Sequence, residues 1–378
     1  MFYKKALEKL GIEVQVVKHG KYKGAVEPFT GNELSPENRS QIERFTAGIW
    51  GNMLSEISES RGIPVTDLNR IADELTTTSI DRAMELGMID SLVYRDQLND
   101  MLESLSGAEP ELVSMYKYKT VPVDSNSEKN GKIALLYAEG NIVMGKGNES
   151  NIGGDFYASV IRKIRESGTY DAMVIRLNSP GGNAMASDLI WREISLAAEE
   201  MPVVVSMSDY AASGGYYISA PATKILAHAN TITGSIGVFG MIPQAGKLLE
   251  NRLGITTESV KTNRFSDSPS LFRAMEPAER ITMQVSVDKT YDDFIGKVAL
   301  GRNILKEEVD QMGEGQVYAG TDALEKGLID AIGGMADAME EASTLAGITG
   351  YRVVEFPTYE DPYSRILKSL SGEIKTSY

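Results

Sequence analysis

Two kinds of hydrophobic pattern alternate along the chain from residue 132 onward: short apolar runs of strand length and longer amphipathic stretches of helix length. The apolar runs predict strands at 132–140, 172–178, 202–208 and 224–228, and the amphipathic stretches predict helices at 155–166, at 184–199 and from 213. Apolar runs that alternate with amphipathic helices are typical of an α/β fold with buried, largely parallel strands. The pattern therefore predicts an α/β fold for this part of the chain.

The chain also contains an internal repeat. The segment AMELGMIDSL at 83–92 matches ALEKGLIDAI at 323–332, an offset of 240 residues. Two further pairs have offsets of 243 and 241 residues: LGI at 10–12 and 253–255, and Ser35-Pro36 and Glu276-Pro277. Three ordered matches at nearly one offset indicate a tandem duplication.

The repeat divides the chain unequally. We predict the C-terminal part of a first copy at 1–107, a linker at 108–131, a full second copy at 132–346 and a C-terminal extension at 347–378. Of the first copy, one strand at 14–20 and the last helices remain, and the counterpart of 132–243 is missing. Since the chain begins inside a helix-like segment without an opening strand, we expect a fragment, or a reading frame that starts at an internal methionine.

Composition excludes several classes of protein. Apolar residues make up 42% and charged residues 24% of the 378 residues, which is the profile of a folded globular protein. The net charge of -15 argues against a nucleic-acid-binding protein, because phosphate backbones need a basic face. The chain has no cysteine, so disulfides, thiol nucleophiles and zinc-thiolate sites are excluded. No apolar run approaches the roughly 18 residues that span a bilayer.

Glycine-containing turns follow three of the strands of the second copy, at 178–184, 209–219 and 232–240. The carboxyl ends of strands are where ligands bind in open α/β folds. Glycines there let backbone N–H groups approach a ligand, and helix N-termini add partial positive charge. We therefore predict an oxyanion-binding corner at these turns, formed by Gly181, Gly182, Gly214 and Gly215.

Ser213 stands where a nucleophile would stand, at the start of a short helix and beside Gly214. The alternative for an isolated Ser-Gly-Gly is a serine that caps the helix N-terminus, a role for which serine is strongly preferred. The neighbouring glycine turn at 178–182 favours the nucleophile.

A serine nucleophile needs a base. The chain has two histidines, of which His228 is expected to be a packing or surface residue and His19, beside Lys21 and Lys23, is a possible base. Lysine is the other option, and it acts near neutrality when an apolar site lowers its pKa from about 10.4 to roughly 7–8.

Four strings resemble the motifs of the signal peptide peptidase A (protease IV) family in its long two-repeat form, and they occur in family order: GKYKGAVEPF (20–29), NSPGG (178–182), AASGGYYIS (211–219) and TGSIGVFG (233–240). The resemblance extends from the first helix to about residue 346. It implies a ClpP/crotonase-like fold, duplicated in tandem with the first copy incomplete.

The resemblance also implies a Ser/Lys dyad. Ser213 matches the nucleophile of the family, Lys23 its general base, and Ser235 a serine that hydrogen-bonds the lysine amine. The oxyanion hole would be formed by the N–H of Gly214 and by one N–H from the turn that holds Gly181 and Gly182. The sequence does not decide which of these two glycines supplies it. A solvated surface lysine and an ordinary turn serine are the alternatives for Lys23 and Ser235.

The resemblance further implies a serine endopeptidase that degrades cleaved signal peptides or other small apolar peptides. Its members form homotetramers at the cytoplasmic membrane with the catalytic domain outside the cytosol. No cofactor and no metal are implied. This chain departs from the pattern in lacking the membrane helix and a complete first repeat. We therefore expect the strand that bears Lys23 to lack neighbours, the lysine to be unburied, and the chain alone to be poorly active or aggregation-prone.

Two other functions fit parts of the sequence. A crotonase-like acyl-CoA enzyme would use the same glycine turns to stabilise a thioester enolate, without a serine nucleophile. A non-catalytic fragment would serve as an assembly or interaction module, which the missing part of the first repeat favours and the presence of all the candidate residues disfavours.

Overall fold

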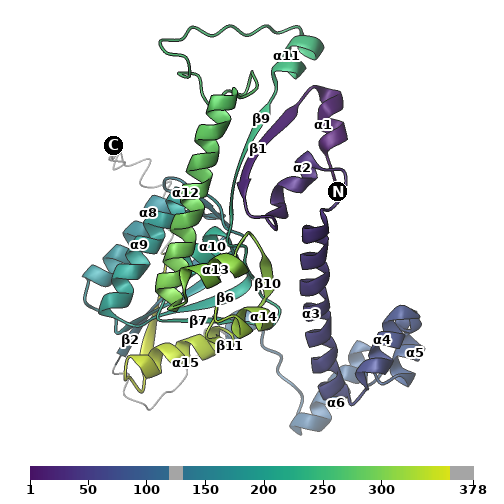
Figure 1. Ribbon diagram of the computed structural model, residues 1–378. Coiled ribbons are helices and arrows are strands. Elements are labelled where there is room, and N and C mark those ends of the chain that lie inside the picture. Colours follow the sequence, from purple (N-terminus) through teal and green to yellow (C-terminus); the bar gives the residue numbers. More distant parts are fainter. Residues whose placement is uncertain (119–130, 358–378) are drawn as a thin grey trace, which may run out of the picture. The chain divides into compact units, whose positions relative to one another are not determined.

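The computed structural model describes residues 1–118 and 131–357 (Figure 1). The chain forms two compact units, one comprising Met1–Gly48 together with Lys129–Tyr378 and the other Ile49–Glu128. This division differs from the predicted repeat boundaries, because the first 48 residues belong to the same unit as the serine-bearing copy. Everything described below about the candidate site lies in the larger unit.

An eight-stranded sheet is the centre of the larger unit within the described residues. Six strands follow the order β10-β8-β6-β5-β2-β12, β7 pairs with β6, and β11 pairs with β7. All the pairs are parallel except β8 with β10. The strands are β2 (Gly131–Glu139), β5 (Ala172–Ser179), β6 (Val203–Ala212), β7 (Lys224–Ala227), β8 (Ile232–Gly234), β10 (Val317–Ala319), β11 (Ala331–Ile332) and β12 (Tyr351–Phe356).

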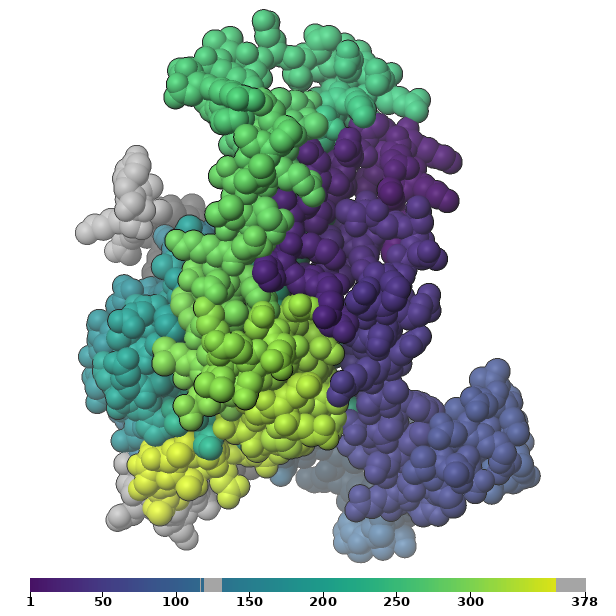
Figure 2. Space-filling view, in the orientation of Figure 1, coloured from purple at the N-terminus to yellow at the C-terminus, as the bar shows by residue number. Residues whose placement is uncertain are grey.

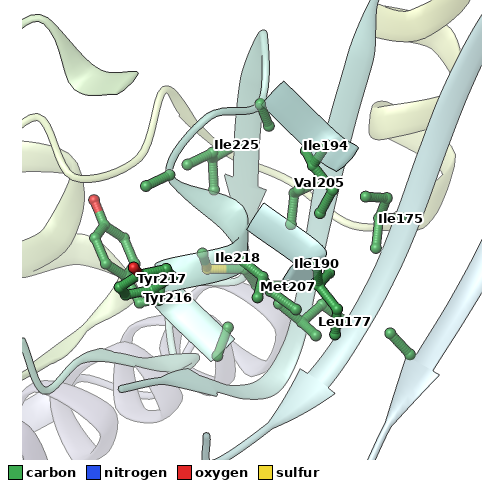
Figure 3. Close-up of a cluster of buried hydrophobic side chains, with 14 of the residues drawn as sticks. Ile175, Leu177, Ile190, Ile194, Val205, Met207, Tyr216, Tyr217, Ile218 and Ile225 are labelled. Carbon is green, nitrogen blue, oxygen red and sulfur yellow. The ribbon is translucent and has the colours of Figure 1, made fainter. Parts of the chain in front are cut away.

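Helices cover both faces of this sheet, so its strands are apolar on both sides. In β2, Ala134 and Leu136 join a core with α8 (Gly154–Glu166), α9 (Ala184–Glu200) and α10 (Gly214–Ser219). The alternate residues Ile133 and Leu135 join a second core with α15 (Met335–Leu345). The first core is drawn in Figure 3, where Leu177 and Met207 of the sheet lie near Ile190 of α9 and Ile218 of α10.

The N-terminal segment packs on the serine-bearing part through a two-stranded ribbon. Strand β1 (Glu13–His19) pairs antiparallel with β9 (Val238–Gln244), from Glu13 opposite Gln244 to His19 opposite Val238. Helix α12 (Pro277–Arg302) runs along the ribbon, and Arg280 donates to the carbonyl of Val16 at 3.1 Å. In Figure 2 the purple N-terminal residues lie directly against the green surface that includes α12. The residues that follow β1 are thereby held beside the strands that follow β6.

The remaining elements complete the chain. In the larger unit they are α1 (Lys4–Leu10), η1 (Gly24–Val26), α2 (Glu27–Thr30), β3 (Asn141–Val143), β4 (Asn151–Gly153), α11 (Gly246–Leu253), α13 (Lys306–Met312) and α14 (Gly320–Glu325). Helix α3 (Pro36–Arg61) begins in the larger unit and continues into the smaller one, which also holds α4 (Val65–Asp73), η2 (Thr76–Thr78), α5 (Ile80–Glu85), α6 (Arg95–Ser106) and α7 (Met115–Tyr118).

The predicted α/β fold is confirmed. Each predicted strand and helix of the second copy is present, and the main differences lie at ends: β6 continues to Ala212 instead of ending at 208, and the glycine turn at 232–240 contains β8 and the start of β9. No helix among residues 1–118 and 131–357 has the length and apolar character that a membrane span requires.

Two helices that the predicted duplication would relate to each other have the same length. Helices α3 and α12 both start at a proline, Pro36 and Pro277, and each has 26 residues. The helices that follow them, α4 and α13, start at Val65 and Lys306, which preserves the same spacing. The tandem repeat and the predicted domain boundaries remain predictions.

Candidate active site

Ser213 lies at the turn between β6 and α10. Its N–H donates to the carbonyl of Gly234 at 2.8 Å, and its carbonyl accepts the N–H of Tyr217 at 2.9 Å, so the backbone is held on both sides. Ser213 occupies the N-cap position of α10, but its side chain makes no capping hydrogen bond. The alternative interpretation as an ordinary helix cap is therefore wrong. The hydroxyl is instead engaged by a lysine from the other end of the chain.

Lys23 reaches Ser213 from a turn just after β1. Its Nζ lies 3.0 Å from Ser213 Oγ, 2.9 Å from Ser235 Oγ and 2.9 Å from the carbonyl oxygen of Ser235. The structure thus brings together Ser213, Lys23 and Ser235, the three side chains that the sequence singles out. Two of them are 190 residues apart in the chain.

The amine of Lys23 is buried, with 4% of the residue exposed. Burial lowers the pKa of Lys23 from 10.5 to about 7, and no charged neighbour is among the causes. No ion pair within the described parts of the chain involves Lys23. Its partners are hydroxyl and carbonyl oxygens, which can hydrogen-bond an uncharged amine without favouring the ammonium as a carboxylate would.

The expectation that Lys23 would be unburied is wrong. The strand before it has a neighbour, because β9 of the serine-bearing part pairs with β1 along its whole length. Two glycines then close over the lysine: a Cβ on Gly315 would lie 2.7 Å from the Lys23 amide nitrogen, and a Cβ on Gly237 would lie 3.3 Å from Lys23 Cδ. The residues of this chain alone therefore bury the amine.

Ser213 and Ser235 both have left-handed backbone conformations. Their φ angles are 54° and 51°, values that residues with a Cβ rarely adopt. Ser213 has ψ of -119°, outside the small left-handed helical region. Such strain costs on the order of 1–3 kcal/mol and persists where the surroundings enforce it. At Ser213 the sharp strand-to-helix turn resembles in geometry the strained turn that exposes nucleophilic serines in other α/β enzymes.

The glycine turn at 178–182 packs against Ser213. A Cβ on Gly181 would lie 2.6 Å from the Gly214 nitrogen, and a Cβ on Gly214 would lie 3.1 Å from the Gly182 nitrogen, so neither position has room for a side chain. The N–H of Gly181 donates to Ser179 Oγ at 3.1 Å. Within the described residues the N–H groups of Gly182 and Gly214 have no hydrogen-bond acceptor. Gly181 and Gly182, between which the sequence does not decide for the oxyanion hole, thus differ in the structure: the N–H of Gly181 has an acceptor and the N–H of Gly182 has none among the described residues. Gly215 packs instead against the carbonyl of Ser179, 2.7 Å from where its Cβ would be.

Two hollows are lined by Ser213. One of about 510 Å³ is lined by Lys23 and Ser235 together with polar residues of α3, among them Asn38 and Gln41. The other has a volume of about 300 Å³, and its lining includes Ala184, Tyr217, Val238, Phe239 and Phe294. Ser213, Gly182 and Phe239 line both hollows. The two hollows therefore adjoin each other at Ser213.

Neither histidine contacts Ser213 among the contacts of the described residues. His19 Nδ1 lies 2.7 Å from Asp288 Oδ1, and its ring stacks on Tyr291 with centroids 3.9 Å apart. His228 is exposed, as expected for a surface residue, and its N–H donates to Thr231 Oγ1 at 3.0 Å.

The sequence analysis does not identify several residues that shape the site. Gly315 and Gln41 are examples: the first lies against Lys23 and the second lines the same hollow. The string GEGQ at 313–316 is a weak signal for a close backbone approach, and a single glutamine on a helix carries no signal at all.

Comparison with known proteins gives the family. The model of peptidase family S49 matches residues 1–109 and 195–349. The chain belongs to peptidase family S49. It is 34% identical over 359 residues to Protease 4 of Haemophilus influenzae, which is 91% of this chain and 58% of that protein. It is 35% identical over 376 residues to the chloroplastic serine protease SPPA of Arabidopsis thaliana, which is 97% of this chain and 55% of that protein. The chain thus spans less than two thirds of these relatives. The predicted resemblance to signal peptide peptidase A is confirmed.

Solved structures were also matched. A mutant of the 1510-N membrane-bound stomatin-specific protease, in complex with a substrate peptide, has a TM-score of 0.39 at 16% identity and covers 64% of this chain and 98% of its own. A ClpP1 mutant from Listeria monocytogenes has a TM-score of 0.37 at 16% identity and covers 54% of this chain and 94% of its own.

Strain at Ser213 gives a prediction on stability. Glycine normally destabilises relative to alanine by about 0.4–1 kcal/mol through the entropy of the unfolded chain. Because φ is 54° at this position, we expect the reverse here: Ser213→Gly should be more stable than Ser213→Ala by about 1 kcal/mol. Urea unfolding of the two variants, both of which lack the hydroxyl, measures the difference. A Ser213→Ala protein that is the more stable of the two would contradict the strain.

Burial of Lys23 predicts a pH-dependent stability. The folded-state pKa of about 7 is lower than the unfolded value of 10.5. The protonated form is therefore disfavoured on folding. The cost is complete below pH 7, shrinks as the pH rises from 7 to 10.5, and vanishes above. A shift of this size corresponds to roughly 5 kcal/mol. We expect Lys23→Met to exceed the wild type in stability by about 2–4 kcal/mol at pH 6, less than the full cost because three hydrogen bonds are lost.

Denaturant unfolding at pH 6 and pH 9.5 measures this difference, which should shrink at the higher pH. Lys21→Met is the matched control, since Lys21 is exposed and forms an ion pair with Glu314 at 2.8 Å. The Lys21 variant should show no gain at pH 6. A Lys23→Met difference that does not vary with pH would mean that the amine is solvated in the folded protein.

Proposed function

We propose that this chain carries the active site of a serine endopeptidase in which Ser213 is the nucleophile and Lys23 is the general base. The observation that carries the proposal is the contact of 3.0 Å between the buried Lys23 Nζ and Ser213 Oγ. Membership of peptidase family S49 supports it independently.

The amine has the hydrogen-bonding capacity that the first step needs. An uncharged amine donates two hydrogen bonds and accepts one. In the uncharged form Lys23 keeps its donations to the Oγ and the carbonyl of Ser235. We assign its lone pair to the proton of the Ser213 hydroxyl, whose Oγ lies 3.0 Å from Nζ. As Ser213 Oγ bonds to the carbonyl carbon of a peptide, its proton passes to Lys23, and the carbonyl π-electrons move to the oxygen.

The oxyanion so formed needs donors that are already in place. We assign this role to the N–H groups of Gly214 and Gly182, because the N–H of Gly181 is used by Ser179. Gly214 is the first residue of α10, so its N–H has no acceptor within the helix. A pair of fixed N–H donors is worth several kcal/mol to a developing oxyanion.

Completion of the reaction uses the same lysine twice. When the peptide C–N bond breaks, the Lys23 ammonium gives its proton to the leaving nitrogen, and an ester of Ser213 remains. A water molecule then attacks this ester, with the uncharged Lys23 taking its proton. The second oxyanion then collapses, and the bond between the carbonyl carbon and Ser213 Oγ breaks. Lys23 gives the proton it took from water to Ser213 Oγ, and the carboxylic acid product leaves, which restores the starting state.

The proposed substrates are extended apolar peptides, of which cleaved signal peptides are one kind. The support is the hollow of about 300 Å³ beside Ser213, whose lining includes Val238, Phe239 and Phe294. Assembly into a tetramer of tandemly repeated subunits, placement at the cytoplasmic membrane and a catalytic side outside the cytosol are proposals that rest on the family resemblance alone.

A covalent probe tests the nucleophile. A fluorophosphonate should label Ser213, and peptide mass spectrometry should locate the adduct there. Ser213→Ala should remove the labelling, and Ser219→Ala, which changes a buried serine of the same helix, should retain it. A wild-type protein that is folded but unlabelled would favour a non-catalytic assembly module, and binding of coenzyme A without labelling would favour an acyl-CoA enzyme.

The pH dependence tests the base. Because Lys23 acts uncharged and its pKa is about 7, kcat/KM for an apolar peptide should rise with pH through about 7 and then level off. Lys23→Met should lower kcat/KM by on the order of 10³-fold or more and leave no rise near pH 7. An unchanged rise in the Lys23 variant would assign the titration to another group.

A further inference from the structure

Lys23 is the central residue of a very tight turn. Its φ and ψ are -72° and 75°, and the N–H of Gly24 donates to the carbonyl of Tyr22 at 2.7 Å. These are the features of an inverse γ-turn. Such a turn is closed by one hydrogen bond alone, so its orientation in the protein depends on contacts from outside.

Gln41 of α3 supplies a contact on the closing carbonyl itself. Its Nε2 donates to the carbonyl of Tyr22 at 2.9 Å, which therefore accepts two hydrogen bonds. Gln41 is 5% exposed. At this depth a lost partner would leave a buried polar group unsatisfied.

The oxygen of the same side-chain amide contacts β10, which lies next to Ser235. Gln41 Oε1 accepts the N–H of Val317 in β10 at 3.1 Å. The residue before Val317 accepts the N–H of Ser235 at 2.7 Å through its carbonyl. One side-chain amide thus contacts both the turn that carries Lys23 and the first residue of β10. The residue just before β10 hydrogen-bonds Ser235, which is a partner of the lysine amine.

A chain of buried polar groups fixes the amide in turn. Gln41 Nε2 also donates to Asn38 Oδ1 at 2.7 Å, and Asn38 Nδ2 donates to Glu27 Oε2 at 2.9 Å. Glu27 accepts the hydroxyl of Ser35 at 2.6 Å, just before α3 begins. Each of Glu27, Asn38 and Gln41 is less than 9% exposed. Connected networks of this kind hold a single arrangement.

We propose that Gln41 is a positioning residue, whose side-chain amide holds the Lys23 turn against the strand beside Ser235 and so places the Lys23 amine on the Ser213 hydroxyl. The proposal rests on the function proposed above and assigns to it a residue that does not touch the reacting atoms.

The test compares three variants of the full chain. Gln41→Met keeps the length of the side chain and removes every hydrogen bond of the amide. We expect kcat to fall by about 10–100-fold with KM changed by less than about threefold, since a small misplacement of a reacting group has effects of this size. Gln41→Asn, which keeps an amide that is too short to reach both partners, should show an intermediate loss and decides the question if Gln41→Met does not fold.

The matched control is Arg44→Met, three residues further along α3. Arg44 also attaches this helix to the body of the unit, through Asp322 at 3.0 and 3.2 Å, but it does not contact the Lys23 turn. We expect its kcat to stay within about twofold of the wild type, whatever it loses in unfolding temperature. If Gln41 only attached the helix to the rest of the unit, the Gln41 and Arg44 variants would have similar kcat values.

A measurement that does not depend on catalysis tests the positioning role of Gln41 independently of the proposed peptidase function. Competitive acetylation by acetic anhydride over a range of pH, with the modified Lys23 quantified by mass spectrometry, measures the titration of that amine. A turn that is no longer held admits water, so the midpoint should move upward by about one pH unit in Gln41→Met and remain unchanged in Arg44→Met.

An unchanged Lys23 midpoint and an unchanged kcat in folded Gln41→Met or Gln41→Asn would overturn the positioning role, even if Ser213 proves to be the nucleophile. Equal effects in the Gln41 and Arg44 variants would overturn it as well. If instead wild-type Ser213 resists the fluorophosphonate while the Lys23 midpoint still responds to Gln41, then the peptidase assignment fails and the positioning of the lysine stands.

Discussion

An amine buried without a carboxylate is the constraint around which the site is built. A carboxylate beside Lys23 would stabilise the ammonium and return its pKa toward the ordinary range, whereas burial among hydroxyl and carbonyl groups lowers it to about 7. The site therefore needs close packing on every side of the lysine stem. Gly237 and Gly315 provide it by letting backbone come nearer than any side chain would allow. The folded protein is less stable as a consequence, and the rest of the unit has to compensate for the cost.

The free-energy cost of burying Lys23 is offset by the contacts that attach the N-terminal segment to the rest of the unit. Strand β1 is held by β9, and β9 continues directly from the turn that contains Ser235. The same strand pairing thus fixes the lysine turn and one of its two serine partners. Ser213, which follows the last residue of the central strand β6, is held by the hydrogen bond from its N–H to the carbonyl of Gly234 in β8. Because Gly234 immediately precedes Ser235, the two serines cannot shift independently, and the lysine meets a single rigid pair of hydroxyl groups.

Much of this could be predicted from the sequence, and the exceptions have physical reasons. The strands of the central sheet follow from apolar runs such as 172–178, and Ser213, Lys23 and Ser235 follow from short strings that occur in family order. The burial of Lys23 could not be predicted, because it depends on pairing between segments more than 200 residues apart, Glu13–His19 and Val238–Gln244. The distinction between Gly181 and Gly182 depends on where one serine hydroxyl, that of Ser179, accepts a bond. Gln41 acts through two backbone groups, and no residue pattern marks that.

The hydrogen bonds of Lys23 also imply how protonation controls the site without any change of fold. The three oxygens around Nζ suit both protonation states. An ammonium donates to all three, so the Ser213 hydroxyl becomes an acceptor and its proton points elsewhere. Loss of one proton turns a single contact around: the amine keeps two donations to Ser235 and accepts from Ser213. In the proposed mechanism, the catalytically competent and incompetent states then differ by the direction of one hydrogen bond within a fixed set of heavy atoms. A site of this kind needs no moving lid to respond to pH, but it needs the lysine, both serines and their supporting turns to be held rigidly in both states.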